Sequence, residues 1–390
     1  MNRIRDMAGL PVRHGQIVRT AFADCHDDSA VERLVRDMGS EGLDLVILFM
    51  SPNSDLNKVL AEATEAFAPA HVIGCTTAGE LSEHGYSEDE IVAIGLPSSH
   101  FQTRTILIED LTEFQAQPII DRMIRNRNQM AWETPDWGSE FALLLVDGLS
   151  LREDELTSQL ALGLGNVPLF GGSAGDGNLF ESTYVMHDQH VLSNAAVLVQ
   201  VRSCCPIKVF KADHLVPTEK RMVVTGADPA RRIVCEINAE PAAREYARIL
   251  GKDPEQLTTF TFAAHPVVVR IGDQHHVRAI QQVAPNGDLV FFSAIDEGVV
   301  LTLAEPDDMV THLEAEMSRL RSYGTPDMIL GCDCILRRVE SEQKQRTGEI
   351  SRILADNRVV GFSTYGEQVN SMHVNQTLTG VAIYPPEEDR

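Results

Sequence analysis

The closing segment of the chain, residues 359–384, gathers the polar side chains best suited to binding a ligand. Its hydroxyl-rich glycine turn and the stretch after it supply five candidate contacts: Ser363, Thr364, Glu367, Asn375 and Thr377. His373 lies among them, and an extended strand would direct His373, Asn375 and Thr377 to one side. This grouping favours a ligand pocket. A partly solvated strand face with one hydrogen-bonded histidine is the simpler interpretation.

Two cysteines near this segment could also support chemistry. Cys332 and Cys334 put two thiols on one side of an extended stretch, which suggests a metal site or a thiol-redox pair. A structural zinc site usually draws on two pairs spaced as C-x-x-C, and the sequence has no second pair. One buried cysteine and one solvent-facing or redox-active cysteine is therefore the competing interpretation.

The motifs of common enzymes are missing or incomplete. Residues 171–175 match G-x-S-x-G, the nucleophile elbow of serine hydrolases, but that motif requires a helix directly after the serine. Here Asp176, Gly177 and Asn178 follow, which predicts a loop. No glycine turn carries the ending of a phosphate-binding P-loop, and none reads G-x-G-x-x-G. We therefore expect a binding protein without enzymatic turnover.

A repeated pattern positions these residues. An apolar strand, an amphipathic helix, a second strand, a glycine turn and a further strand recur three times, with the turns at residues 74–80, 171–176 and 361–367. Residues 74–80 and 361–367 match position for position, so we expect the turns to lie at comparable sheet ends. The sequence predicts an α/β fold with mixed sheets built from repeated strand-helix-strand-turn-strand units.

The C-terminal half contains a segment of different character. After a short helix, the ranges 266–271, 277–283 and 289–295 read as strands, with a hairpin turn at 285–288. This pattern predicts an antiparallel insertion. The change of character places the domain boundary near residue 225, which gives domains of residues 1–225 and 226–390.

Composition excludes several classes of partner. The chain has 390 residues, 43% of them hydrophobic, and a formal net charge of −24. Such a charge repels nucleic acid and anionic lipid, so neither is expected as a partner. The first 20 residues contain no apolar run typical of a signal peptide, and no later segment could span a bilayer. Seven cysteines, an odd number, favour free thiols in a reducing compartment, and we expect a cytoplasmic protein.

The chain also resembles the FIST family of bacterial sensory proteins over nearly its whole length. The resemblance rests on IGCTTAGELSEHGYSEDEIVAIGL and LFGGSAGDG in the N-terminal half. In the C-terminal half it rests on HPVVVRIGDQHHVRAI, IDEGVVLTL and the closing GFSTYGEQVNSMHVNQTLTGVAIY. It implies FIST N-type and FIST C-type sensory domains acting in signal transduction.

A two-domain chain of this length is similar to the nitric-oxide-sensing branch of that family. This implies non-covalent haem b, nitric oxide as the signal, and regulation of a histidine kinase or a cyclic-di-GMP signalling protein. His373 would be the axial ligand, with His265 as the second candidate, and Arg278, Arg337 and Arg338 could meet the propionates. The alternatives are a FIST sensor of a small polar metabolite such as an amino acid, and a redox or metal sensor using Cys332 and Cys334. A homodimer is possible in each case.

Overall fold

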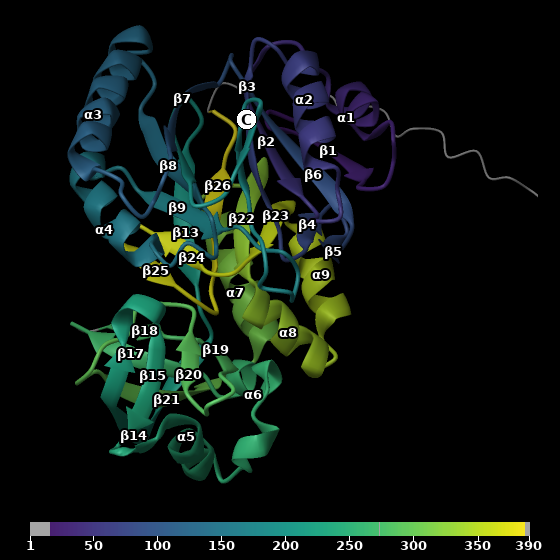
Figure 1. Ribbon diagram of the computed structural model, residues 1–390. Coiled ribbons are helices and arrows are strands. Elements are labelled where there is room, and N and C mark those ends of the chain that lie inside the picture. The colour runs from purple at the N-terminus through teal and green to yellow at the C-terminus, as the bar shows by residue number, and fades with distance from the viewer. Residues whose placement is uncertain (1–15, 273, 387–390) are drawn as a thin grey trace, which may run out of the picture.

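The computed structural model describes residues 16–272 and 274–386, and Figure 1 shows their arrangement. The prediction that the first 20 residues hold no signal peptide falls largely on residues 1–15, which lie outside the described residues. Among the residues described, no helix is both long and apolar enough to cross a lipid bilayer.

The first unit shows how the sequence pattern becomes structure. The residues of the strand LDLVILFM are nearly all buried, and Asp55 caps the following helix by accepting a hydrogen bond from the Lys58 backbone N–H (3.1 Å). The unit runs β1 (Arg19–Asp24), α1 (Ala30–Met38), β2 (Leu43–Met50), α2 (Leu56–Ala66), β3 (His71–Thr76), β4 (Glu80–Ser82), β5 (Gly85–Ser87) and β6 (Glu90–Pro97).

The second and third units repeat this order. The second runs β7 (Phe101–Ile108), α3 (Ala116–Glu133), β8 (Ser139–Val146), α4 (Glu153–Leu164), β9 (Leu169–Ser173), β10 (Val185–His187), β11 (His190–Leu192) and β12 (Ala196–Ser203). The third runs β13 (Ile207–Ala212), α7 (Met309–Arg321), β22 (Met328–Cys334), α8 (Ile335–Gln343), α9 (Thr347–Asp356), β23 (Val359–Thr364), β24 (Glu367–Val369), β25 (Met372–Val374) and β26 (Leu378–Ile383). The predicted α/β fold with repeated units and mixed sheets is confirmed.

Each unit completes its sheet with a hairpin from another unit. The described strands give the orders β1-β6-β2-β3-β10-β11, β7-β12-β8-β9-β24-β25 and β13-β26-β22-β23-β4-β5. The hairpin of the first unit thus joins the third sheet, that of the second joins the first, and that of the third joins the second. This cyclic exchange gives the three units a pseudo-threefold arrangement.

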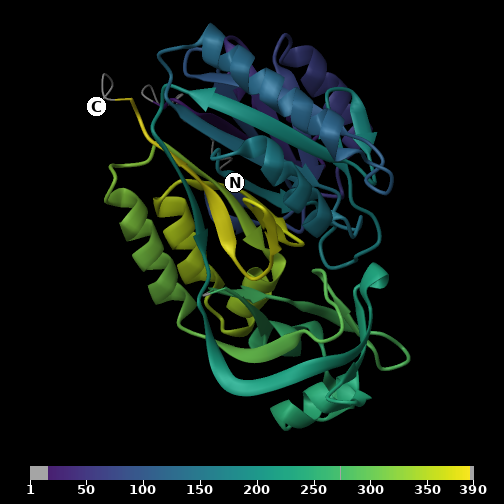
Figure 2. The same ribbon diagram turned by 90° about the vertical axis from the view of Figure 1, so that its left-hand side faces the viewer.

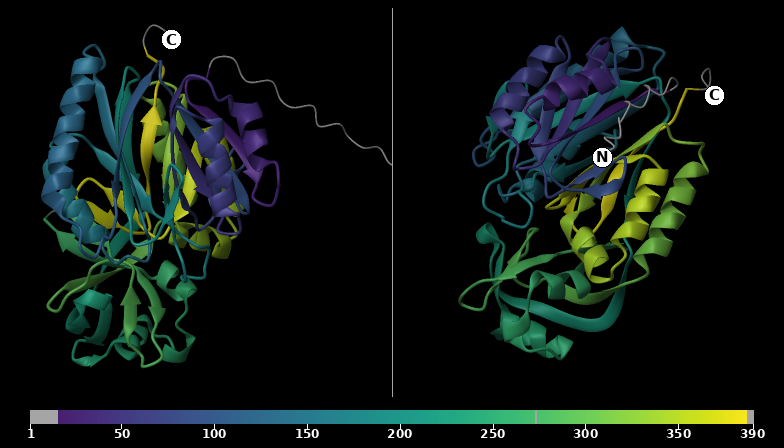
Figure 3. Two further views of the ribbon diagram at one scale, coloured as in Figure 1. Left: turned by 45° about the horizontal axis from the view of Figure 1, so that its top comes forward. Right: turned by 90° about the vertical axis from the view of Figure 1, so that its right-hand side faces the viewer.

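The three sheets enclose one apolar core. Their inward-facing side chains form a single buried cluster that includes Phe49, Phe170 and Phe362, and the rings of Phe49 and Phe362 stack at 4.4 Å. Helices cover the outside, with α1 and α2 on the first sheet and α3 and α4 on the second (Figures 1 and 3).

The predicted insertion is a fourth, antiparallel sheet between β13 and α7, and Figure 2 shows the chain descending into it through the long strand β14. Its elements are β14 (Leu215–Asp228), β15 (Ile233–Ile237), β16 (Glu240–Pro241), α5 (Ala242–Leu250), α6 (Thr259–Ala264), β17 (Val267–Ile271), β18 (Gln274–Val277), β19 (Ile280–Val283), β20 (Leu289–Phe291) and β21 (Val300–Pro306). Residue 225 lies inside β14, and the boundary between residues 225 and 226 stays a prediction.

Two expected strands are each divided in the structure. Residues 277–283 belong to β18 and β19, which pair with different neighbours. Residues 372–378 do not form one strand either, because Gln376 takes a left-handed conformation (φ 51°) between β25 and β26. His373 and Leu378 consequently belong to different sheets.

Candidate functional site

The three glycine turns lie at comparable sheet ends, as predicted, and the structure shows in addition that they bind one another in a ring. Backbone hydrogen bonds link each turn to the next: Gly175 N–H to Thr76 O (3.0 Å), Ser173 N–H to Gly366 O (2.8 Å) and Ala78 N–H to Ser363 O (2.9 Å). Because each turn belongs to a different unit, a displacement of one turn disturbs both of the others.

Three equivalent glycines allow the strands below these turns to approach each other. A Cβ atom on Gly74, Gly171 or Gly361 would lie closer than 3.0 Å to the backbone carbonyl of the neighbouring parallel strand. Real Cβ atoms essentially never come so close. The glycines that begin each repeated motif are thus required by close packing of backbone on backbone.

The structure brings together the five polar residues proposed as ligand contacts, and it closes them from solvent. Ser363, Thr364, Glu367, Asn375 and Thr377 are at most 1% exposed. The carboxyl group of Glu367 accepts hydrogen bonds from the hydroxyls of Thr364 (2.6 Å) and Thr377 (2.6 Å). In this conformation Thr364, Glu367, Asn375 and Thr377 bind other groups of the protein, whereas the Ser363 hydroxyl has no hydrogen-bond partner among the described residues. The role of all five as ligand contacts stays a prediction.

Burial strongly perturbs Glu367 and its counterpart in the first unit. Desolvation raises the pKa of Glu367 to about 8, and it raises the pKa of Glu80 to about 7. Thr77 donates to Glu80 as Thr364 donates to Glu367. Sequence reasoning matched these two turns by position and did not assign Glu80 a role.

The raised pKa of Glu367 predicts a pH dependence of stability. The folded protein keeps a proton that the unfolded chain releases above about pH 4.5, so this contribution to stability is full below that pH and is lost as the pH rises towards about 8. The slope for one proton is about 1.4 kcal/mol for each pH unit. Glu367→Gln should flatten the pH profile of urea unfolding by that slope, and parallel profiles for the two proteins would contradict the assignment.

His373 is buried, and one of its ring nitrogens lacks a partner. The residue is 2% exposed, and its Nδ1 lies 3.3 Å from the amide nitrogen of Gln368. Since that amide nitrogen can only donate, Nδ1 accepts and Nε2 carries the proton. Among the described residues Nε2 has no hydrogen-bond partner. The other candidate, His265, lies half-buried at the end of α6 in the insertion, where its carbonyl accepts a hydrogen bond from Tyr246 (2.5 Å).

A haem does not fit the site in this conformation. A Cβ atom on Gly366 would lie only 2.7 Å from His373 Nε2, so the turn backbone covers the atom that would bind iron. Two of the arginines considered for the propionates are already paired, Arg337 with Asp333 (2.7 Å) and Arg338 with Glu88 (2.8 Å). Haem binding by His373 or His265 stays a prediction, and at His373 it requires the third turn to move.

The two cysteines of β22 are buried thiols. Cys332 and Cys334 are at most 1% exposed, and burial raises the pKa of both thiols well above its ordinary value. Protonated thiols are poor nucleophiles, and among the described residues neither cysteine belongs to a group of three potential metal ligands. Nothing in this environment favours the metal or redox role, which stays a prediction.

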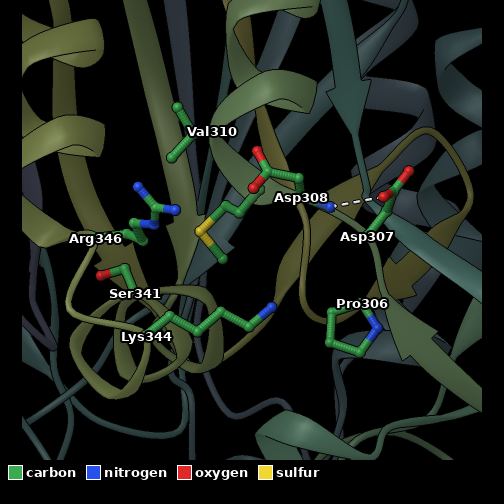
Figure 4. A pocket seen from close by; sticks show the side chains of 8 residues that line it. Pro306, Asp307, Asp308, Val310, Ser341, Lys344 and Arg346 are labelled. Atoms are coloured by element: carbon green, nitrogen blue, oxygen red, sulfur yellow. Dashed lines mark hydrogen bonds between the residues drawn. The ribbon is translucent and has the colours of Figure 1, made fainter.

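An open cavity of about 460 Å³ lies beside α8, where the insertion rejoins the third unit (Figure 4). One wall carries the cations Lys344 and Arg346 together with Ser341, and the other carries Asp307 and Asp308. The arrangement can hold a small molecule that bears both a negative and a positive group. Sequence reasoning missed this cavity, because its walls come from segments that are distant in the chain.

A buried chain of polar contacts leads from this cavity into the third sheet. Lys344 Nζ donates to Glu340 (2.7 Å), Glu340 contacts His214 (2.9 Å), Arg337 contacts His214 (3.0 Å) and Asp333 (2.7 Å), and Tyr86 donates to Asp333. The four central residues are at most 2% exposed. The i,i+4 spacings of Asp333 with Arg337 and of Glu340 with Lys344 were visible in the sequence, but His214 carried no signal.

The chain of contacts ends beside the glycine turns. Asp333 stands opposite Ser363 in the parallel pairing of β22 with β23, and the negative charge of Asp333 adds to the raised pKa of Glu367. The open cavity is thus joined to Asp333 by hydrogen bonds, and the charge of Asp333 acts on the closed polar cluster.

The described residues thus form three interlocked units with an inserted antiparallel sheet. Comparison with protein families finds the FIST N domain over residues 44–240 and the FIST C domain over residues 242–370. The chain therefore belongs to the FIST family, whose domains are sensory and in general non-catalytic, and this indicates a role in signalling. A search of curated proteins found no match.

Proposed function

We propose that the chain is a cytoplasmic, non-catalytic sensor of a small polar metabolite, of the size and charge of an amino acid. The observation that supports it is the open, charged cavity whose Lys344 begins the buried chain of contacts to the glycine turns. The carboxyl group of Glu367 already accepts hydrogen bonds from Thr364 and Thr377, whereas the cavity is open to a ligand.

The charges of the cavity select a zwitterion. A ligand carboxylate would meet Lys344 and Arg346, and a ligand ammonium group would meet Asp307 and Asp308 (Figure 4). Arg346 is paired with Glu349 (2.8 Å), but this ion pair is exposed and therefore weak enough for a ligand carboxylate to replace. A ligand with a single charge would be attracted to the wall of opposite charge and repelled by the other wall. Mixed walls thus favour dipolar molecules over simple anions or cations.

Ligand binding can reach the turns because Lys344 has a second partner. A carboxylate in the cavity competes with Glu340 for the ammonium group of Lys344, and Glu340 is fully buried. Without Lys344, the Glu340 carboxylate would keep only His214 as a partner. A buried charge with so few partners raises the free energy of this conformation. The bound state would therefore favour a rearranged chain of contacts, which is the difference in affinity that a sensor needs.

Isothermal titration of the purified protein with individual amino acids tests this proposal. We expect at least one to bind, and Lys344→Met and Arg346→Met to weaken its binding by about tenfold or more. Lys58→Met removes an exposed, ion-paired lysine of α2 and is the matched control, with unchanged affinity expected. No binding by any amino acid, or equal binding by all variants, would contradict the proposal.

A second candidate is the haem-based nitric-oxide sensor, favoured by the buried, unpartnered Nε2 of His373. A bound haem would supply the gas-binding iron, and His373 would have to leave the cover of Gly366 to hold it. Protein from haem-supplied cells should then show a Soret absorption band that nitric oxide shifts and that His373→Ala abolishes. A colourless protein would remove this candidate without affecting the first.

In either case we propose that the output partner is a histidine kinase or another signalling protein, with a homodimer as a possible assembly. The sensory family supports a signalling partner in general, and the two proposals share this step.

A further inference from the structure

We propose that Cys25, His26 and Asp89 form a site for a transition-metal ion of the zinc type. The three residues bring one thiol, one imidazole and one carboxylate together, with their ligand atoms within 4.8 Å of one another. Within residues 16–272 and 274–386, no other group of three or more such side chains meets this spacing. The site is far from the cavity of the proposed function in sequence, and it does not depend on that function.

Two turns of the first unit hold these ligands next to each other. Cys25 and His26 follow β1, and Asp89 directly precedes β6, the strand that pairs with β1. The Cys25 backbone N–H donates to the Asp89 carbonyl (2.8 Å) and clamps the two turns together. The ligands therefore come from neighbouring, well-paired strand ends, which gives a more precise site than a free loop would.

The donor types and their separation suit a tetrahedral ion. Zinc binds cysteine sulfur at about 2.3 Å and carboxylate oxygen at about 2.0–2.2 Å, which puts two such ligands roughly 3.5 Å apart. The Cys25 sulfur lies 3.9 Å from Asp89 Oδ1, so a small movement closes the site. The Cys25 thiol now donates to Asp89 Oδ1. A metal ion would take the place of the thiol proton, which would be released to solvent.

Outer contacts already orient the carboxylate. Asn53 donates to Asp89 Oδ1 (2.8 Å), and the Ser51 hydroxyl lies 3.3 Å from the same atom. Metal ligands in proteins are commonly held in this way by a second layer of hydrogen bonds. His26 and Asp89 are exposed, which gives an ion a path to the site and leaves a fourth position for water.

The position of the site links it to the first glycine turn. Glu90 follows Asp89, and its backbone N–H donates to the buried carboxyl of Glu80 (3.3 Å), while Ser51 N–H donates to the Glu90 carbonyl (3.1 Å). Fixing Asp89 on a metal would thus stiffen the strand end that supports Glu80. We infer that metal binding changes the rigidity of the ring formed by the three glycine turns.

Titration of the full-length protein with Co²⁺ tests the site, because a cobalt–thiolate bond produces a near-ultraviolet charge-transfer band. We expect one ion per chain, displacement by Zn²⁺, and release of about one proton near neutral pH from the bound thiol. Cys25→Ser should abolish the band, and His26→Ala and Asp89→Asn should weaken binding by about tenfold or more. Asn tolerates the left-handed conformation of residue 89 (φ 57°), so the fold should persist.

The exposed Cys235 provides the control, because Cys235→Ser should leave the band and the affinity unchanged. His26 is exposed, so its variant stays informative even if Cys25→Ser folds poorly. Cobalt binding without a thiolate band, or binding that is equal in the wild type and the His26→Ala variant, would overturn the proposal.

Discussion

Gly361→Ala is expected to destabilise the protein by about 4 kcal/mol or more, a large share of the stability of a typical domain. The added Cβ would collide with the backbone carbonyl of Gly331 on the paired strand β22. A backbone atom cannot turn aside as a side chain can, so the strands must separate or lose their register. Urea unfolding followed by circular dichroism measures the loss.

Gly138→Ala is the matched control for this experiment. No atom lies within 4 Å of a Cβ built on Gly138, so a change within about 0.5 kcal/mol is expected. Gly74→Ala and Gly171→Ala should be as harmful as Gly361→Ala, because the three positions are equivalent in the repeat. A mild effect at all three would mean that the strands are not packed as closely as the structure shows.

Arg337→Met should lower the free energy of unfolding by about 3–5 kcal/mol, because it leaves the charge of Asp333 buried without its cation. Arg337 and Asp333 are each 1% exposed and lie 2.7 Å apart. Methionine replaces most of the apolar volume of the arginine and leaves little cavity. The loss of unfolding free energy therefore comes mainly from the missing charge and its hydrogen bonds. Chemical denaturation at neutral pH gives the value.

A second substitution separates the effect of the unpaired Asp333 charge from the other interactions lost with Arg337. Asp333→Asn removes the orphaned charge and retains an acceptor for the Tyr86 hydroxyl. The double variant should therefore recover about 2 kcal/mol relative to the sum of the single losses. Strict additivity would show that the two residues are not coupled in the way that the buried chain of contacts requires.

The repeated units could be predicted from the sequence because each contains a nearly continuous apolar strand and a helix with a clear apolar stripe, and the turns recur with the same glycines. The exchange of hairpins could not be predicted. The segments β4, β10 and β24 have three residues each, and nothing within so short a segment distinguishes a partner in its own unit from one in the next.

The candidate site was predicted in part for a similar reason. Thr364 and Glu367 stand in one short motif, so their proximity followed from the turn, and the structure places Thr377 with them. The expected strand through Thr377 failed because Gln376 adopts a left-handed conformation that residue type alone does not announce. The charged cavity and His214 depended on contacts between distant segments, which a single sequence does not encode locally.

The exchange of hairpins also constrains how the chain can be made. Leu81 in β4 pairs with Gly361 in β23, so the first hairpin to leave the ribosome waits for a partner near the other end of the chain. Until then only the first sheet has all of its strands, and the outer edge of β23 has no complement if the third unit is produced alone. A fragment that ends before the third unit therefore leaves β4 without its partner β23 and leaves the second sheet without β24 and β25.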